Sequence, residues 1–261
     1  MPRSAASTRT AAAQRFLLRS LGDGINFVGA LARNVDIGGK SLYSFVPNTG
    51  VFTLIGIYKP NNTNPVNGIM GNTILTTEKG FAFFTDGNRK LQMIGYNGSG
   101  NAFSAVSLIG LPVDYLNKTF LFIASSNGGT TITFSVGNFE TPMLHDARAS
   151  AASLSAGDMT NNLTLGRASS TFGPGRAEGL EWHIYNTELS QAEKDTFHLT
   201  GQLPSGLVGS KYVIPSGASG ATITDSGSFA NNGTLTSVAY TSDPMKKLKP
   251  RSAAASRAPV S

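Results

Sequence analysis

Residues 179–204 constrain the fold more than any other stretch, because they combine a strand, a turn and a capped helix. Ser190 stands at an N-cap position, and Glu193 three residues later completes a capping box by reaching back to the free N–H of the cap. Gly201 then supplies the left-handed stop that ends many helices. The pattern predicts a short helix at about 190–200, placed directly after a strand.

The residues before this helix alternate as a half-buried strand does. Trp182 and Ile184 point to one face, and Glu181, His183 and Tyr185 point to the other. A lone tryptophan beside an isoleucine on a strand is more often part of a core than a sugar-binding platform. We therefore expect Trp182 in the core and His183 on the surface.

Short strands separated by glycine and asparagine turns predict an all-β chain. Hairpin signals stand at residues 86–88 (DGN) and 127–129 (NGG). Charged residues make up 14% of the chain, against about 25% in an average domain. The predicted strands cover residues 51–58, 80–85, 90–96, 119–125, 130–136, 162–167, 179–185 and 211–214. This spacing is typical of an antiparallel sandwich or jelly roll, with residues 144–157 as a brief helix or a loop.

The net charge of +6 is concentrated at the two ends of the chain. Both ends are rich in alanine, serine and arginine, so they can bury little apolar surface and are predicted to be flexible. The domain boundaries follow as a basic arm at 1–15, one sandwich domain at 16–243 and a basic tail at 244–261. The predicted contact residues of the two ends are Arg3, Arg9, Arg15, Lys246, Lys247, Lys249 and Arg251.

Two absences exclude several classes of protein. The chain has no cysteine, which rules out disulfides, thiolate catalysis and cysteine-based metal sites. No apolar run reaches the roughly 18 residues of a membrane span, and the first residues lack the apolar stretch of a secretory signal. We therefore expect no membrane span and a location in a virion or inside a cell.

The order of these motifs resembles the laminin-G-like, concanavalin-A-like jelly-roll family. The motifs are a strand ending in Lys59-Pro60, the hairpin at 119–136, Leu165-Gly166-Arg167, the strand and Leu-Ser-x-x-Glu helix at 184–193, and the turn at 225–235. The resemblance covers roughly residues 16–240. It implies an antiparallel jelly-roll sandwich. The family's turn usually precedes the sandwich but stands last here, so residues 205–240 are an edge hairpin or the start of a partial second unit.

A catalytic role is not expected. Related β-glucan-cleaving enzymes on this fold carry the strand pattern Glu-x-Asp-x-x-Glu, which this chain lacks. Glu178 and Glu181 are three residues apart, so we expect them on opposite faces of a strand. The three histidines, His145, His183 and His198, are not spaced as metal ligands. The chain is therefore predicted not to be an enzyme.

The resemblance also implies where ligands would bind. Sugar binding on such folds uses aromatic faces with asparagine hydrogen bonds, which makes the candidates Tyr58, Tyr96, Tyr185, Asn97 and Asn127. Family members often hold Ca²⁺ at a rim, and here the candidate ligands are Asp225, Asn231 and Asn232, or separately Asp86 and Asn88. The alternative for these five residues is that they only form turns.

Taken together, the sequence predicts a non-catalytic structural and surface protein of a virus- or phage-like particle, as a capsid, decoration or fibre component with a lectin-like body. Its partners would be copies of itself or other particle subunits, and a surface glycan. The basic ends would contact nucleic acid or neighbouring subunits. The alternative is a free carbohydrate-binding or adhesion module, and a glycoside hydrolase ranks third.

Overall fold

The computed structural model describes residues 24–27, 34–61, 66–72, 77–138, 141–150, 156–168, 177–215 and 218–241. The predicted contact residues of the two basic ends all lie outside these ranges, namely Arg3, Arg9, Arg15, Lys246, Lys247, Lys249 and Arg251. The predicted domain boundaries at 15 and 243 lie outside them as well, so both stay predictions.

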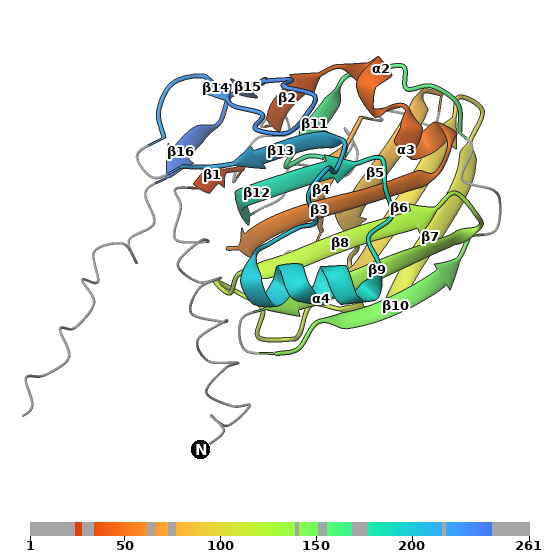
Figure 1. The fold of residues 1–261 in the computed structure, drawn as a ribbon, viewed down its shortest axis with the longest axis horizontal. Helices are drawn as coiled ribbons and strands as arrows, with labels where there is room; N and C mark the ends of the chain where they lie inside the picture. The colour runs from red at the N-terminus through yellow and green to blue at the C-terminus, as the bar shows by residue number, and fades with distance from the viewer. Residues whose placement is uncertain are drawn as a thin grey trace, which may run out of the picture.

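The described chain folds into two antiparallel sheets packed face to face (Figure 1). Across sheet A the order is β10 (Leu144–Ala149), β9 (Thr131–Asn138), β8 (Phe120–Asn127), β3 (Val51–Pro60), β12 (Ala177–Tyr185), β1 (Gly24–Asn26) and β16 (Ala239–Thr241), with β13 (Gly209–Val213) also paired to β12. Across sheet B the order is β14 (Thr222–Ile223), β15 (Gly233–Thr236), β2 (Asn34–Gly38), β11 (Leu163–Leu165), β4 (Asn67–Gly71), β5 (Lys79–Thr85), β6 (Lys90–Asn97) and β7 (Asn101–Gly110). The predicted jelly-roll sandwich is confirmed.

The main core lies between the two sheets. Strand β3 shows how it forms, because its side chains are apolar on both faces. Phe52 and Leu54 point into the main core, whereas Ile55 and Ile57 belong to a second apolar cluster on the outer face of sheet A. A continuous apolar run of this kind is expected for a strand that is covered on both sides. Something must therefore cover the outer face of sheet A.

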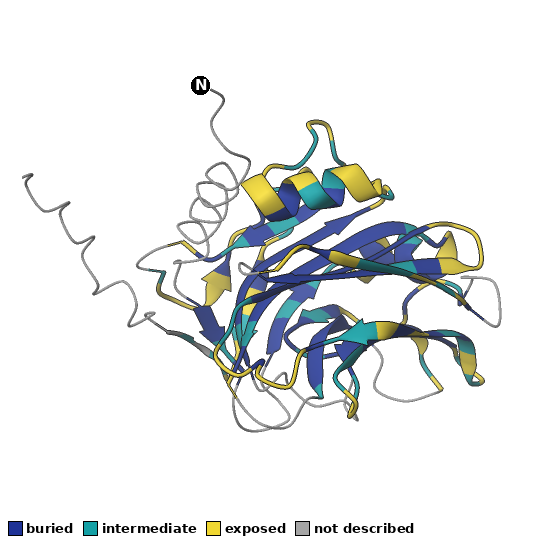
Figure 2. Cartoon of the chain, turned by 90° about the horizontal axis from the view of Figure 1, so that it is seen from below, coloured by how far each residue is buried: buried dark blue, intermediate teal, exposed yellow. Residues whose placement is uncertain are grey.

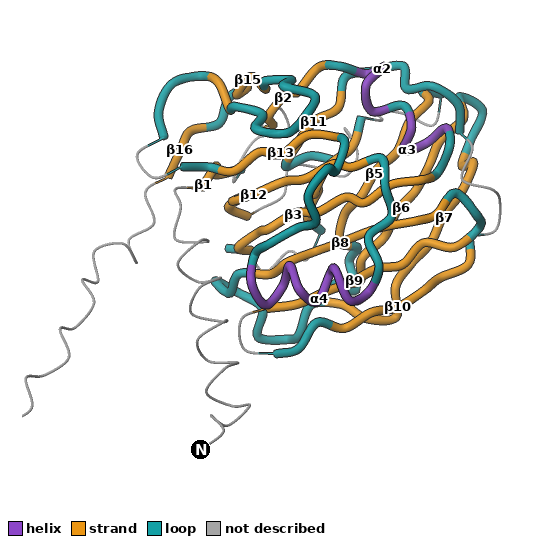
Figure 3. The backbone as a smooth tube through the Cα atoms, viewed as in Figure 1, coloured by secondary structure: helices purple, strands orange, loops and turns teal. Residues whose placement is uncertain are grey.

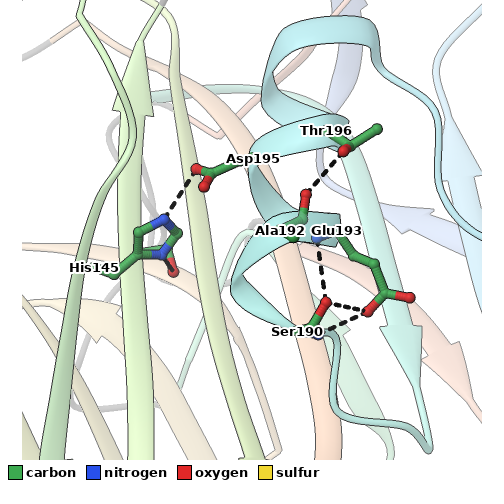
Figure 4. Close-up of polar contacts among 7 residues, drawn as sticks. His145, Ser190, Ala192, Glu193, Asp195 and Thr196 are labelled. Atoms are coloured by element: carbon green, nitrogen blue, oxygen red, sulfur yellow. Dashed lines mark hydrogen bonds and ion pairs between the residues drawn. The ribbon is translucent and has the colours of Figure 1, made fainter.

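Helix α4 (Gln191–Thr200) is that cover, and it lies across the outer face of sheet A (Figures 1 and 3). The predicted caps are confirmed. Ser190 Oγ accepts a hydrogen bond from the Glu193 backbone N–H at 3.3 Å, and the Ser190 N–H donates to Glu193 Oε2 at 2.7 Å (Figure 4). Gly201 ends the helix with φ of 67°. The inner side of α4 is buried and its outer side is exposed (Figure 2).

Two parts of the fold differ from the sequence-based predictions, and a third decides between two predicted alternatives. Residues 144–149 form strand β10 at the edge of sheet A, so the helix or loop predicted for 144–157 is wrong over that range. Two one-turn helices, α2 (Lys40–Tyr43) and α3 (Phe45–Asn48), add to the single helix that was predicted. The C-terminal segment adds β13 and β16 to sheet A and β14 and β15 to sheet B. Strands β14 and β15 form an edge hairpin of sheet B, as one of the two alternatives predicted, and the segment does not start a second unit.

None of the helices in the described ranges has the length and apolar character needed to cross a lipid bilayer.

Candidate functional site

A pocket of about 540 Å³ opens on the outer side of sheet A. Strand β12 contributes Tyr185 and strand β13 contributes Lys211. The rest of the wall comes from residues of the 201–207 segment, which follows α4, and from the turn at 226–228. Two strands thus supply a phenol and an ammonium group to a concave polar surface.

The register of β12 against β13 explains why these two side chains meet. Tyr185 pairs with Gly209, and His183 pairs with Lys211. Residues two apart along one strand share a face of the sheet, and so do residues directly opposite each other on paired antiparallel strands. The outer side of sheet A therefore carries Tyr185, His183 and Lys211. Tyr185 and Lys211 are diagonal neighbours, a relation that places Cα atoms roughly 7–8 Å apart.

A buried chain of hydrogen bonds runs from the pocket into the protein. The Tyr185 hydroxyl lies 2.8 Å from His183 Nδ1, and His183 Nε2 lies 2.5 Å from Glu181 Oε1. Glu181 and Tyr185 are each 5% exposed and His183 is fully buried. The surface position predicted for His183 is wrong, because α4 covers this face and the Phe197 ring packs edge-on against the imidazole at 5.4 Å.

The environment of Tyr185 keeps its hydroxyl protonated. Burial is the main cause that raises the pKa of Tyr185 above its usual value, and the charges of Glu181 and Asp225 raise it further. The phenol is therefore a hydrogen-bonding group at neutral pH. It is not poised to act as a tyrosinate nucleophile.

Asp225 organises the turn that forms one side of the pocket. Its Oδ1 accepts hydrogen bonds from the backbone N–H groups of Lys211 and Gly227, both at 2.7 Å, and its Oδ2 accepts from Asn231 at 2.9 Å. Asn232 Oδ1 in turn accepts from the Asp225 N–H at 2.9 Å. These bonds fasten the turn to β13 and thereby shape the pocket.

The same bonds test the predicted calcium ligands. The oxygens of Asp225 receive N–H donors, and the amide nitrogen of Asn231 donates to the Ile37 carbonyl. A Ca²⁺ site needs six or more converging oxygens, and this arrangement does not fit one. Asp86 is engaged in the same way, since its Oδ1 accepts from the N–H groups of Asn88 and Lys90. Within the described ranges no group of three or more histidine, cysteine, aspartate or glutamate side chains is placed to hold a metal ion.

The other tyrosines predicted as ligand-binding are not at the pocket. Tyr58 is 1% exposed in the main core, where its hydroxyl donates to the Ile69 carbonyl and accepts from the Trp182 indole N–H. Its prediction as a surface aromatic is wrong, because this face of β3 points between the sheets. Tyr96 is 8% exposed in a small apolar cluster with Phe84 and others on sheet B.

The two predicted asparagines each stabilise a hairpin turn away from the pocket. Asn97 Oδ1 accepts from the Ser99 N–H at 3.0 Å, and Asn127 Oδ1 accepts from the Gly129 N–H at 3.1 Å. Of the five predicted ligand-binding residues, only Tyr185 lines the pocket. Lys211 was missed, because its place beside Tyr185 depends on the register of two strands that are distant in sequence.

Glu178 and Glu181 lie on the same face of β12, which contradicts the prediction of opposite faces. The pairing with β3 shifts between Gly179 and Glu181, so that Glu178 is opposite Lys59 and Glu181 is opposite Ile57. Because Lys59 and Ile57 are two residues apart, the bulge restores the two carboxylates to one side. Neither lines the pocket; Glu178 lies 4.0 Å from Lys59 Nζ and Glu181 bonds to His183.

Further polar contacts fasten α4 to the sheet. His145 on β10 lies 3.0 Å from Asp195 Oδ1 on α4 (Figure 4), and its Nδ1 lies 2.9 Å from Ser135 Oγ. Lys194 Nζ donates to Ser125 Oγ at 2.6 Å. The Ser135, His145 and Asp195 series has the residue types of a catalytic triad, but Ser135 is fully buried and does not line the pocket. These groups therefore hold the helix in place.

Burial of tyrosines predicts a distinctive response to alkali. Burial raises the pKa values of Tyr58, Tyr185 and Tyr212 well above the usual value of about 10, and it also raises that of Tyr43. Above pH 10 the unfolded chain releases protons that the native state retains, so stability is lost as the pH rises. We expect the tyrosinate absorbance of these residues to appear only together with alkaline unfolding.

The control for this titration is the chain in denaturant, where all 7 tyrosines should ionise together near pH 10. A native protein whose tyrosines all ionise reversibly near pH 10, with an unchanged circular dichroism spectrum, would contradict the prediction.

Comparison with known proteins supports the fold. No protein-family model matches the chain, and no curated protein matches it in sequence. A Bacteroides ovatus protein described as carbohydrate-binding is similar in structure, with a TM-score of 0.54 and 13% identity over 84% of this chain. This chain spans 59% of the length of that protein.

Two further solved structures have lower scores. The CBM40 of the Ruminococcus gnavus IT-sialidase has a TM-score of 0.46 and 14% identity over 67% of this chain and 96% of its own. Domains LG4-5 of the mouse laminin α1 chain have a TM-score of 0.44 and 13% identity over 64% of this chain and 46% of theirs. The fold of the described chain is thus the antiparallel jelly-roll sandwich that the sequence motifs predicted.

Proposed function

We propose that this protein is a non-catalytic recognition module that binds a saccharide in the pocket beside Tyr185 and Lys211. The observation that carries the proposal is that Tyr185 and Lys211 both line one concave pocket of about 540 Å³. Sites for small ligands are usually concave and hold a few fixed polar groups. Both groups stand on paired strands, so they are fixed relative to each other.

Two further observations support this proposal. The structurally similar Bacteroides ovatus protein is described as carbohydrate-binding. By analogy of fold, this favours a saccharide over other small polar molecules as the ligand. The residues that line the pocket include no carboxylate, whereas glycoside hydrolysis generally uses two carboxylates that flank the scissile bond. Binding without hydrolysis is therefore the function that the pocket supports best.

The test is binding of the full chain to a glycan array, followed by calorimetry with the tightest binder. We expect Tyr185→Phe and Lys211→Met each to weaken binding by on the order of tenfold, since each removes one hydrogen bond to the ligand. Tyr96→Phe and Lys118→Met are the matched controls, because both residues lie away from the pocket, and they should bind as the wild type does. Failure to bind any glycan, or equal losses in the controls, would contradict the proposal.

A second proposal is that the saccharide-binding body belongs to a subunit of a virus- or phage-like particle. It rests on the clustering of cations at both ends of the sequence, since basic arms can neutralise nucleic acid or contact neighbouring subunits. We expect light scattering to show assemblies of the full chain that become smaller when residues 1–15 and 244–261 are deleted. A monomer at all salt concentrations would overturn this second proposal.

A further inference from the structure

We infer that Glu181 and His183 position the Tyr185 hydroxyl so that its proton points into the protein and its oxygen accepts a hydrogen bond from a ligand hydroxyl. This inference rests on the proposed function, because it concerns the same pocket. It makes Glu181 and His183 positioning residues that never touch the ligand. It also defines which saccharides the pocket selects, namely those that donate a hydroxyl proton at Tyr185.

The direction of the proton follows from the order of the groups. A carboxylate that is ionised has no proton to donate, so with Glu181 in that form the hydrogen at its 2.5 Å contact is on His183 Nε2. In that tautomer, with one ring proton on Nε2, the other nitrogen accepts, and at 2.8 Å the Tyr185 hydroxyl then donates to Nδ1. With its one proton used, the Tyr185 oxygen presents only lone pairs to the pocket.

Lys211 on the neighbouring strand gives the pocket a group of the opposite character. Its ammonium group can only donate, and it lies on the strand paired with β12, opposite His183. The pocket therefore places an acceptor on β12 diagonally across from a donor on β13. A saccharide would enter with a hydroxyl donor toward Tyr185 and an oxygen acceptor toward Lys211, which fixes its orientation.

Packing alone does not account for Glu181 and His183. Replacement of a buried polar or ionic pair by apolar residues of similar size is often neutral or stabilising, and the neighbours on this face are apolar, such as Ile55, Ile57 and Leu189. The hydrogen-bond chain from this pair ends at the hydroxyl of Tyr185, a residue that lines the pocket. We therefore assign to Glu181 and His183 the role of fixing the direction of the Tyr185 hydroxyl proton.

The first experiment uses a panel of methyl glycosides of glucose, galactose and mannose, each with its singly deoxygenated and singly fluorinated derivatives. Fluorine replaces a hydroxyl without a proton to donate. We expect one position at which both derivatives bind on the order of tenfold more weakly than the parent glycoside. In Tyr185→Phe the preference for the parent should disappear, whereas Tyr96→Phe should keep it.

His183→Leu separates positioning from a merely structural role. Its Tyr185 hydroxyl would lack the internal acceptor and could donate to the ligand as well as accept from it, so the fluorinated derivative should lose less affinity relative to the parent than it does in the wild type. Glu181→Gln still offers an oxygen to His183 Nε2 and should keep the wild-type preference. An unchanged preference for the parent glycoside in His183→Leu would overturn the inference.

A second measurement does not depend on binding or on a folded variant. The ¹⁵N chemical shifts of the His183 ring in the wild-type protein should show Nε2 protonated and Nδ1 unprotonated. A proton on Nδ1 would overturn the inference. If the wild type binds the parent glycosides no more tightly than their deoxygenated and fluorinated derivatives, the inference fails and the proposed function stands. If the wild type binds no glycan, the proposed function fails, whereas the ring nitrogens still decide the direction of the proton.

Discussion

Trp182→Ala is expected to lower the free energy of unfolding by about 4 kcal/mol, as large-to-small changes of buried aromatic residues do. Trp182 is fully buried between the sheets. Its ring packs edge-on against Tyr58 at 5.6 Å and Phe27 at 6.0 Å, and its indole N–H donates to the Tyr58 hydroxyl. The alanine would remove all three contacts and leave a cavity. Urea unfolding followed by circular dichroism measures the effect.

Trp182→Phe and Leu108→Ala are the controls. Phenylalanine keeps an aromatic ring in the core but loses the hydrogen bond to Tyr58. We therefore expect a free energy of unfolding for Trp182→Phe that lies between the values of the wild type and of Trp182→Ala. Leu108 is 66% exposed, and its replacement should change stability by less than about 0.5 kcal/mol. If Trp182→Ala unfolds at the same urea concentration as Leu108→Ala, Trp182 is not part of the core.

The features that could be predicted from sequence depend on neighbours along the chain. The caps of α4 are set by residues three to eleven positions apart, and Ser190, Glu193 and Gly201 occupy them as predicted. The hairpins at 86–88 and 127–129 were also found, since a turn constrains only the strands beside it. The alternation that placed Trp182 and Ile184 in the core needed only one strand.

The pocket could not be predicted in this way, because it depends on contacts between distant segments. Lys211 meets Tyr185 only through the register of β13 against β12. His183 is buried only because α4 turns back over the strand that precedes it. Simple alternation along β12 predicts Glu181 on the face opposite to Glu178. The bulge beside Glu181 instead shifts its carboxylate to the face that carries Glu178. In each case the local sequence is compatible with more than one position for the side chain, and contacts with a distant segment decide between them.

Two glycines permit the close contacts that β13 makes with β12 and with the turn that borders the pocket. At Gly209, whose φ is 154°, an added Cβ would lie 1.9 Å from the Ile184 carbonyl oxygen. At Gly227 an added Cβ would lie 2.3 Å from the Gly209 carbonyl oxygen. Both obstacles are backbone atoms, which cannot rotate away as a flexible side chain would. The strand pair and the turn can therefore approach this closely only with glycine at both positions.

Gly209→Ala is accordingly expected to cost about 3 kcal/mol of stability, as overpacking against backbone at a strained conformation does. The backbone N–H and carbonyl of Gly209 are bonded to Ser228 Oγ and to the Phe229 N–H, so its displacement should also distort the pocket and weaken glycan binding. Gly87→Ala is the control, because nothing lies within 4 Å of its added Cβ. Urea unfolding and calorimetry of both variants test the expectation, and equal stability and affinity of the two would refute it.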